Sequence, residues 1–433
     1  MVGDNKKKYA VKVLANQAGA YPSFDSVYEL CKFYKKHRLP GNIRLKKAIH
    51  RPVWLIKHKA IQYCAEKDKL GSGNFCDVFK GKFKRPKEGS SVKGGGEKIC
   101  DVAIKVCHPV ADKDKKEAQD ARLGMLREAK LMSRYRHEHV IEFYGVACDH
   151  PPVMIVMELC PGGSLENHLR KQGTAIEVSE RILYCFEAAR GMRYLHAQQC
   201  IHRDLAVRNC LISAQGAVKI ADFGLSKIMN DMQKDTAIKM IPLRWMAPET
   251  ITKTPDYSEK SDVWSFGVLM YEIFNLGEKP WPDEPDFKVI AKNIKKGRMV
   301  ELPDITPEPV KVLIKKLWTH DPKGRPPFRE IICFLLDCRM LQTLPAPVDL
   351  KVNKIPGVKR EKGFPENVQQ IKEGRSIQVL KTMTNYEDEM SKDSSTPTTS
   401  LTRLKDSTGE QRNVPSKEIV SGVSSDDAQD FSE

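Results

Sequence analysis

Residues 201–209 read Ile-His-Arg-Asp-Leu-Ala-Val-Arg-Asn, and residues 222–224, which follow an apolar run, read Asp-Phe-Gly. Phosphoryl transfer needs a group that orients the accepting hydroxyl and oxygen ligands for a metal ion. Asp204 can accept the proton of a substrate hydroxyl, while Asn209 and Asp222 offer the amide and carboxylate oxygens that suit Mg²⁺. Each short motif can arise by chance, but their order and spacing together predict a phosphoryl-transfer site.

Two upstream features would hold the phosphates of such a site. The stretch Gly-Ser-Gly-Asn-Phe-Cys-Asp-Val, residues 71–78, lies between two strand-like runs, and its small residues would let backbone amides approach phosphate oxygens. Lys105 ends the apolar strand Val-Ala-Ile-Lys and would contact phosphates as a point charge. Glu128, in a helical stretch, could pair with Lys105. Taken singly, these features could instead be a plain turn, an exposed strand lysine and a solvated helix face.

The bulk composition is that of a protein with a large core. The chain has 433 residues, of which 40% are hydrophobic, and its formal net charge is +16. Twelve scattered cysteines without zinc-site spacing predict reduced thiols and an intracellular protein. The charged N-terminus and the lack of a long apolar run predict neither a signal peptide nor a membrane span. The net positive charge is compatible with nucleic-acid, anionic-membrane or acidic-peptide partners, or simply with a solvated basic surface.

The pattern along the chain predicts three parts. Residues 1–53 form a small basic segment with one helix near residues 24–34. Residues 54–340 begin with strands and continue with helices, among them an amphipathic helix at 182–192, so we predict two lobes of the α+β class. Residues 341–433 are rich in Ser, Thr, Lys and Glu and poor in aromatic residues, so we predict a disordered tail.

Residues 54–340 closely resemble a protein kinase catalytic domain. The whole chain resembles the non-receptor tyrosine kinases of the Fes/Fer family, in which a Src-homology-2 segment precedes the kinase domain. Besides the motifs above, Ala-Pro-Glu at 247–249, Ser-Asp-Val-Trp-Ser-Phe-Gly at 261–267 and Asp-Pro-Lys-Gly-Arg-Pro at 321–326 carry this resemblance. It implies a bilobal kinase fold, ATP with Mg²⁺ (or Mn²⁺) as cofactors, and tyrosine-containing protein substrates.

The resemblance also implies roles for individual residues. Asp262 would brace the catalytic loop, and Arg325 would pair with Glu249. The catalytic residues would be Asp204, Arg208 and Lys105, and the metal ligands would be Asn209 and Asp222. The nucleotide would contact the glycine-rich loop, the strand of the lysine, the gatekeeper and the hinge, namely Leu70, Gly71, Ser72, Gly73, Asn74, Phe75, Cys76, Asp77, Val78, Ala103, Lys105, Glu128, Met157, Glu158, Cys160 and Leu211.

Two places favour tyrosine over serine or threonine as the accepting residue. Ala206 stands where serine/threonine kinases usually have lysine, and Arg208 follows two positions later. Residues 241–246, Ile-Pro-Leu-Arg-Trp-Met, resemble the substrate platform of tyrosine kinases, where Pro242 would pack on the phenol ring. A basic enzyme suits acidic residues around the substrate tyrosine and weak contact with anionic membranes. We expect a cytoplasmic protein, in part peripheral at the membrane, and no nucleic-acid partner, since interleaved aromatic residues are lacking.

Several departures from the family pattern leave alternatives open. Cys76 replaces the third glycine of the loop and is either a reactive thiol or an inert small residue. Residues 9–53 match only the second half of a Src-homology-2 domain, without the Phe-Leu-Val-Arg-like strand, which is compatible with phosphotyrosine binding, a relic or a truncated chain. No tyrosine lies between residues 222 and 249, so activation would use Thr236 or constitutive ordering, and autophosphorylation would fall on Tyr386. A pseudokinase scaffold is the alternative function, opposed by the complete set of catalytic residues.

Overall fold

The computed structural model describes residues 10–11, 22–39, 42–45, 52, 54–72, 76–85, 98–108, 115–223, 226–228, 242–365 and 367–373. Within residues 22–45, helix α1 (Val27–Lys36) confirms the predicted helix. The hydroxyl of Ser26 caps α1 by accepting a hydrogen bond from the backbone N–H of Glu29 at 3.2 Å. The rings of Phe24, Phe33 and Tyr34 pack on one another, with centroids 5.1 to 6.3 Å apart.

The N-terminal lobe is a six-stranded antiparallel sheet with one helix. The strand order is β1-β3-β4-β6-β5, and β2 pairs with β3. Its elements are β1 (Ile61–Gln62), β2 (Lys69–Ser72), β3 (Cys76–Arg85), β4 (Lys98–Cys107), α2 (Lys115–Met132), β5 (Phe143–Ala147) and β6 (Met154–Glu158). Alternating side chains of β3 and β4, such as Phe79, Val102 and Ile104, form the core of this lobe.

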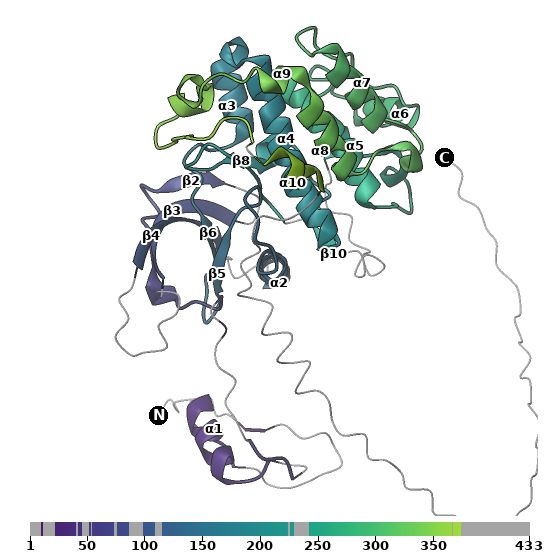
Figure 1. Ribbon diagram of the computed structural model, residues 1–433. Coiled ribbons are helices and arrows are strands. Elements are labelled where there is room, and N and C mark those ends of the chain that lie inside the picture. The colour runs from purple at the N-terminus through teal and green to yellow at the C-terminus, as the bar shows by residue number, and fades with distance from the viewer. Residues whose placement is uncertain are drawn as a thin grey trace, which may run out of the picture. The chain divides into compact units, whose positions relative to one another are not determined.

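The C-terminal lobe is helical and carries two short two-stranded sheets, one of which is a hairpin, beside the motifs expected to be catalytic. Figure 1 shows its helices gathered on one side of the strands of the N-terminal lobe. Its elements are α3 (Leu165–Gln172), α4 (Val178–Ala197), β7 (Cys200–Ile201), β8 (Cys210–Ile212), β9 (Val218–Ile220), β10 (Lys227–Ile228), α5 (Glu259–Phe274), α6 (Phe287–Lys295), α7 (Glu308–Leu317), α8 (Phe328–Asp337), α9 (Arg339–Gln342) and α10 (Val368–Glu373). Strands first and helices later confirm the bilobal α+β prediction.

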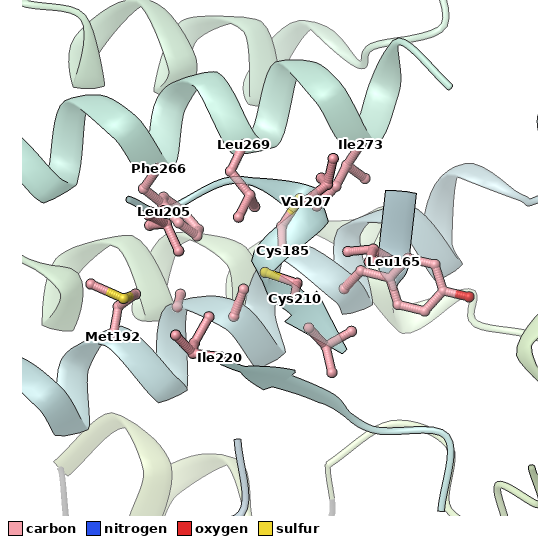
Figure 2. Close-up of a cluster of buried hydrophobic side chains, with 14 of the residues drawn as sticks. Leu165, Cys185, Met192, Leu205, Val207, Cys210, Ile220, Phe266, Leu269 and Ile273 are labelled. Atoms are coloured by element: carbon pink, nitrogen blue, oxygen red, sulfur yellow. The ribbon is translucent and has the colours of Figure 1, made fainter. Parts of the chain in front are cut away.

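One apolar core joins the helices to residues 201–209, here called the catalytic loop. Figure 2 shows Cys185 and Met192 of α4 facing Leu205 and Val207 of the loop and Phe266 and Leu269 of α5. Burial of Leu205 and Val207 fixes the backbone that follows Asp204, because close-packed interiors leave little room for movement.

Helix α4 differs from its prediction. The apolar residues at 182–192 are buried, as expected for an amphipathic helix, but the polar side chains of Glu180, Arg181 and Glu187 are buried as well. The predicted solvent-facing side of α4 is therefore covered, and what covers much of it is the segment that follows α9.

The structure describes helical elements beyond the predicted kinase boundary at residue 340, within the predicted tail. Residues 344–365 and 367–373, which the sequence places in a disordered tail, form the short 3₁₀ helices η8 (Pro347–Asp349) and η9 (Lys351–Lys354) and helix α10. Their buried side chains join the core of the C-terminal lobe. Composition misled the prediction because this segment is held largely by polar contacts with α4. The remainder of the predicted tail, from residue 374, lies outside the described residues.

No helix within the described ranges is long and apolar enough to cross a membrane.

Candidate active site

The lysine of β4 is paired as the sequence predicts. The Nζ of Lys105 lies 2.8 Å from both carboxylate oxygens of Glu128 on α2. It also lies 3.7 Å from Oδ1 of Asp222. Burial alone would lower the pKa of Lys105, but the charges of Glu128 and Asp222 outweigh it and raise that pKa above its ordinary value. Lys105 is therefore a fixed cation that joins the sheet, α2 and the Asp-Phe-Gly motif.

The carboxylate of Asp204 is oriented by residues on its own loop. Asn209 donates from Nδ2 to Asp204 Oδ2 at 2.8 Å and to the Asp204 carbonyl at 2.7 Å. Arg208 donates to the other carboxylate oxygen, Oδ1. Burial raises the pKa of Asp204 above that of an ordinary aspartate, although Arg208 and His202 oppose the shift. A carboxylate with a raised pKa is a better proton acceptor near neutral pH.

The catalytic loop is braced from α5. Asp262, whose exposed fraction is 1%, accepts hydrogen bonds from the backbone N–H groups of His202 at 2.8 Å and Arg203 at 2.9 Å. This confirms the predicted brace. Arg203 has a left-handed backbone, with φ of 69°, and its guanidinium carbon lies 3.9 Å from the ring centroid of Tyr257. The Asp262 bonds hold a backbone conformation that is otherwise unfavourable for a residue with a side chain.

The second predicted pair, Arg325 with Glu249, lies within the C-terminal lobe. Arg325 donates through two nitrogens to the two carboxylate oxygens of Glu249, at 2.7 and 2.9 Å. The Arg325 side chain is fully buried. A bidentate pair of this kind fixes both residues in one geometry.

The nucleotide side is described in part. Gly71 and Ser72 end β2 and are exposed, as is Leu70, while Gly73, Asn74 and Phe75 lie outside the described residues. Asp77 accepts a hydrogen bond from Ser72 and pairs with Lys69.

Cys76 is buried and faces Cys107 across strands β3 and β4. Burial raises the pKa of the Cys76 thiol to about 12, so the reactive thiolate is disfavoured. Of the two alternatives for this residue, the structure favours the inert one.

The expected hinge residues follow one another on and after β6. Met157 pairs with Ala103 of β4, and Glu158 pairs with Val102. The carboxylate of Glu158 is engaged by Lys219 at 2.9 Å, and its N–H donates to the Glu142 carbonyl at 2.9 Å. Val78 on β3, Cys160 after β6 and Leu211 on β8 are each half-buried.

The two predicted metal-ligand positions are linked through the backbone. The N–H of Ala221 donates a hydrogen bond to the carbonyl of Asn209 at 2.9 Å. Asp222 is the next residue after Ala221, so this bond brings the two predicted ligand positions close together. Asp222 has φ of 61° and its side chain is half-exposed. An amide oxygen and an exposed carboxylate beside Lys105 fit Mg²⁺ held mainly by water and nucleotide phosphates, since this ion favours a few protein oxygens.

Beside the predicted substrate platform lies one residue that the motifs did not reveal, Glu272. Arg208 stacks on Trp245, with its guanidinium carbon 4.3 Å from the ring. Glu272 on α5 accepts hydrogen bonds at Oε2 from Trp245 Nε1 at 3.0 Å and from the Val207 N–H at 3.1 Å. The only sequence signal was a glutamate within an apolar helix. Ala206 is buried, and Pro242 is half-buried beside this platform. Thr236 and Tyr386 lie outside the described residues.

Comparison with known proteins places this site in a family. Residues 64–335, more than half of the chain, match the family model described as protein tyrosine and serine/threonine kinase. Fer-related kinase 1 of Caenorhabditis elegans is 35% identical over 305 residues, which cover 69% of this chain and 72% of that protein. Tyrosine-protein kinase Fer of Mus musculus is 33% identical over 279 residues, covering 64% of this chain and 31% of Fer. The transforming protein Fps of avian sarcoma virus (strain PRCII) is 34% identical, over 66% of this chain and 50% of Fps.

Proposed function

The chain belongs to the protein tyrosine and serine/threonine kinase family, within its Fes/Fer group, and on this premise we propose that it transfers the γ-phosphate of ATP to tyrosine hydroxyls of proteins. The observation that carries the proposal is the closed arrangement of Lys105 between Glu128 and Asp222, at 2.8 and 3.7 Å. A chain that had lost its chemistry would not need to hold this half-buried cation against two carboxylates. In the described residues, no observation favours a non-catalytic scaffold.

The residues of the chain divide the work of phosphoryl transfer. Lys105 would hold the α- and β-phosphates, and Asn209 and Asp222 would ligate Mg²⁺ or Mn²⁺ with their side-chain oxygens. When bound, ATP supplies the phosphoryl group and the metal ion balances its charge. Asp204 would orient the accepting hydroxyl and take its proton, a role that suits its raised pKa.

Selectivity for tyrosine would come from the distance between the substrate platform and Asp204. Arg208 lies between the carboxylate of Asp204 and the ring of Trp245, so it fixes the platform relative to the base. A phenol resting on Pro242 can reach Asp204 with its hydroxyl, whereas a serine side chain is too short. Equal rates on matched tyrosine and serine peptides would contradict this mechanism.

We extend the proposal to the partners and domains of the chain. The net charge of +16 supports substrates with acidic residues around the tyrosine and weak contact with anionic membranes, in a cytoplasmic protein. Residues 1–53 would be the second half of a Src-homology-2-like segment. The capped helix α1 and its aromatic cluster support a folded element there.

The test is a kinase assay on the purified full chain with Mg-ATP and a poly-Glu-Tyr peptide, with the modified residue type read by mass spectrometry. Asp204→Asn should lower kcat by about 10²-fold or more and leave nucleotide affinity unchanged, because the carboxylate acts on the hydroxyl. Lys105→Met should lower kcat strongly through lost phosphate positioning. Wild-type turnover in Asp204→Asn would overturn the assignment of the base, and no phosphotyrosine from the wild-type chain would overturn the function.

A further inference from the structure

Residues 344–365 and 367–373, here called the C-terminal strap, lie beyond residue 335, where the match to the kinase family model ends. The strap nevertheless belongs to the C-terminal lobe, because four of its apolar side chains are buried in that core. These are Leu350, Val352, Val358 and Ile371. In Figure 1 the last helix of the strap, α10, lies beside α8 and α4. Two polar contacts support this placement, since Arg193 donates to the Ile371 carbonyl at 3.0 Å and Lys372 pairs with Asp337 at 2.5 Å.

Two buried carboxylates of α4 receive the strap. Glu180 and Glu187 lie two turns apart on one face of α4, with exposed fractions of 1% and 3%. Glu180 accepts the backbone N–H groups of Lys351 and Val352, each at 2.9 Å. Glu187 pairs with Arg360 at 2.7 Å. Buried carboxylates need such partners, because an unpaired charge in a protein interior is strongly unfavourable. The kinase unit is therefore incomplete without the strap.

The strap also forms hydrogen bonds with the turn that joins β8 to β9. Arg360 donates to the carbonyl of Gly216 at 2.8 Å, and the N–H of Lys359 donates to the carbonyl of Ala214 at 2.8 Å. Glu187 uses its second oxygen to accept the N–H of Val218, which begins β9, at 2.8 Å. The fit is tight, since a Cβ placed on Gly216 would come within 2.8 Å of the Arg360 Cβ.

This turn is the far end of the hairpin that carries both proposed metal ligands. Asn209 immediately precedes β8, and Asp222 follows β9 by two residues. At their end of the hairpin the two strands are joined by the bond from the Ala221 N–H to the Asn209 carbonyl. A short hairpin held at its turn and packed along its length transmits the position of the turn to its ends, because the strands are hydrogen-bonded and buried.

We propose that Arg360 is a positioning residue for the metal site: by joining Glu187 of α4 to the β8–β9 turn, it sets the separation of Asn209 and Asp222. The proposal rests on the proposed function, since it assigns these two residues as metal ligands. It extends the functional kinase domain beyond residue 335 to include Arg360. It also assigns a catalytic-support role to a segment outside the family model. Residues that hydrogen-bond directly to metal ligands change metal affinity about 10- to 100-fold when removed, and Arg360, which acts through the hairpin, should lie at the lower end of this range.

The test compares Arg360→Met with Lys359→Met in the full chain. The methionine at 360 keeps the aliphatic length but loses the bonds to Glu187 and Gly216. Lys359 is a neighbouring control, because its side chain is exposed and pairs with exposed Glu361 while its backbone bond to Ala214 is unaffected. For Arg360→Met we expect a rise of about tenfold in the Mg²⁺ concentration for half-maximal activity at saturating ATP. Hydrogen exchange at the amides of residues 218–222 should also accelerate. Lys359→Met should match the wild type in both measurements.

Two further measurements keep the proposal testable if Arg360→Met does not fold or if the wild-type chain is inactive. If Arg360→Met does not fold, Arg360→Lys serves instead, since it retains the charge opposite Glu187 but cannot make both bonds; it should show a smaller shift in the same direction. Mn²⁺ binding to the ADP-loaded protein, read by electron paramagnetic resonance, separates this proposal from the proposed function. An inactive wild-type chain would overturn the function, yet weaker Mn²⁺ binding in Arg360→Met would still support the positioning role. A variant that loses thermal stability while its Mg²⁺ and Mn²⁺ dependence stays at the wild-type level would overturn the positioning role.

Discussion

Replacing Glu272 by glutamine should stabilise the protein at neutral pH. Glu272 is 3% exposed, and burial raises its pKa from the ordinary 4.5 to about 8, against the opposing effects of the bonds from Trp245 and Val207 and of the Arg208 charge. The bonds from Val207 and Trp245 both reach the same oxygen, Oε2, at 3.1 and 3.0 Å. The amide oxygen of glutamine can accept both bonds, and its NH₂ group takes the place of the protonated oxygen.

The magnitude follows from the proton balance. The folded-state pKa of Glu272 lies above the unfolded value, so its contribution to stability is fully present below pH 4.5 and is lost as pH rises toward 8. One pKa unit corresponds to about 1.4 kcal/mol, so the wild type should lose about 3 kcal/mol of unfolding free energy between pH 5 and pH 7.5 through this group alone. Glutamine does not titrate, and the variant should escape this loss.

The assay is chemical denaturation of the wild type and Glu272→Gln at pH 5 and pH 7.5, with the difference in unfolding free energy compared between the two pH values. The difference should grow by about 3 kcal/mol in favour of glutamine. Glu272→Leu is the control: it removes the acceptor for Trp245 and Val207 and should destabilise the fold at both pH values. A glutamine variant whose advantage is the same at both pH values would show that Glu272 is ionised in the folded protein and refute the reasoning.

Three other measurements address the remaining features of the site. Cys76 should react with iodoacetamide far more slowly than the exposed Cys31, because burial raises the pKa of Cys76 to about 12; equal labelling by mass spectrometry would contradict this. Tyr257→Leu should lower kcat roughly five- to tenfold and Tyr257→Phe should not, since the ring face contacts the Arg203 guanidinium; equal losses would exclude this contact as the cause. Thr236→Ala should keep wild-type turnover if the segment orders without phosphate, and a dead variant would show the opposite.

Contacts that depend on short motifs could be predicted from the sequence. The pairs Lys105–Glu128 and Arg325–Glu249, and the brace from Asp262, all appear where the resemblance placed them. Each of these pairs has at least one partner in a recognisable motif, and identifying that motif is enough to expect the contact. Glu272 has no such motif. Its position inside an apolar helix gave no sign that its carboxylate would face the loop after Asp204.

The C-terminal strap could not be predicted for a different physical reason. Its buried apolar residues fall at positions 350, 352, 358 and 371, a spacing with neither the period of a strand nor that of a helix. Low apolar content argues for disorder only when a segment must order itself by burying its own side chains. Here the order comes from backbone N–H groups bound by Glu180 and from one arginine bound by Glu187.

The sequence of α4 did contain a sign of these contacts, in charged residues that would ordinarily be expected to face water. Glu180 and Glu187 stand opposite the apolar stripe, where charged residues usually face water, and Arg181 stands at the edge of that stripe. Arg181 instead donates to three backbone carbonyls, those of Ile176, Gly173 and Ile273. These charges bind the main chain of neighbouring segments, and the segments that they bind need little apolar content of their own. A charged face on a central helix and a polar segment far along the chain therefore explain each other, because the charges of the helix bind the main chain of the segment. Each has a plainer interpretation alone, and only their contact in the folded lobe distinguishes a solvated face and a loose tail from a buried interface.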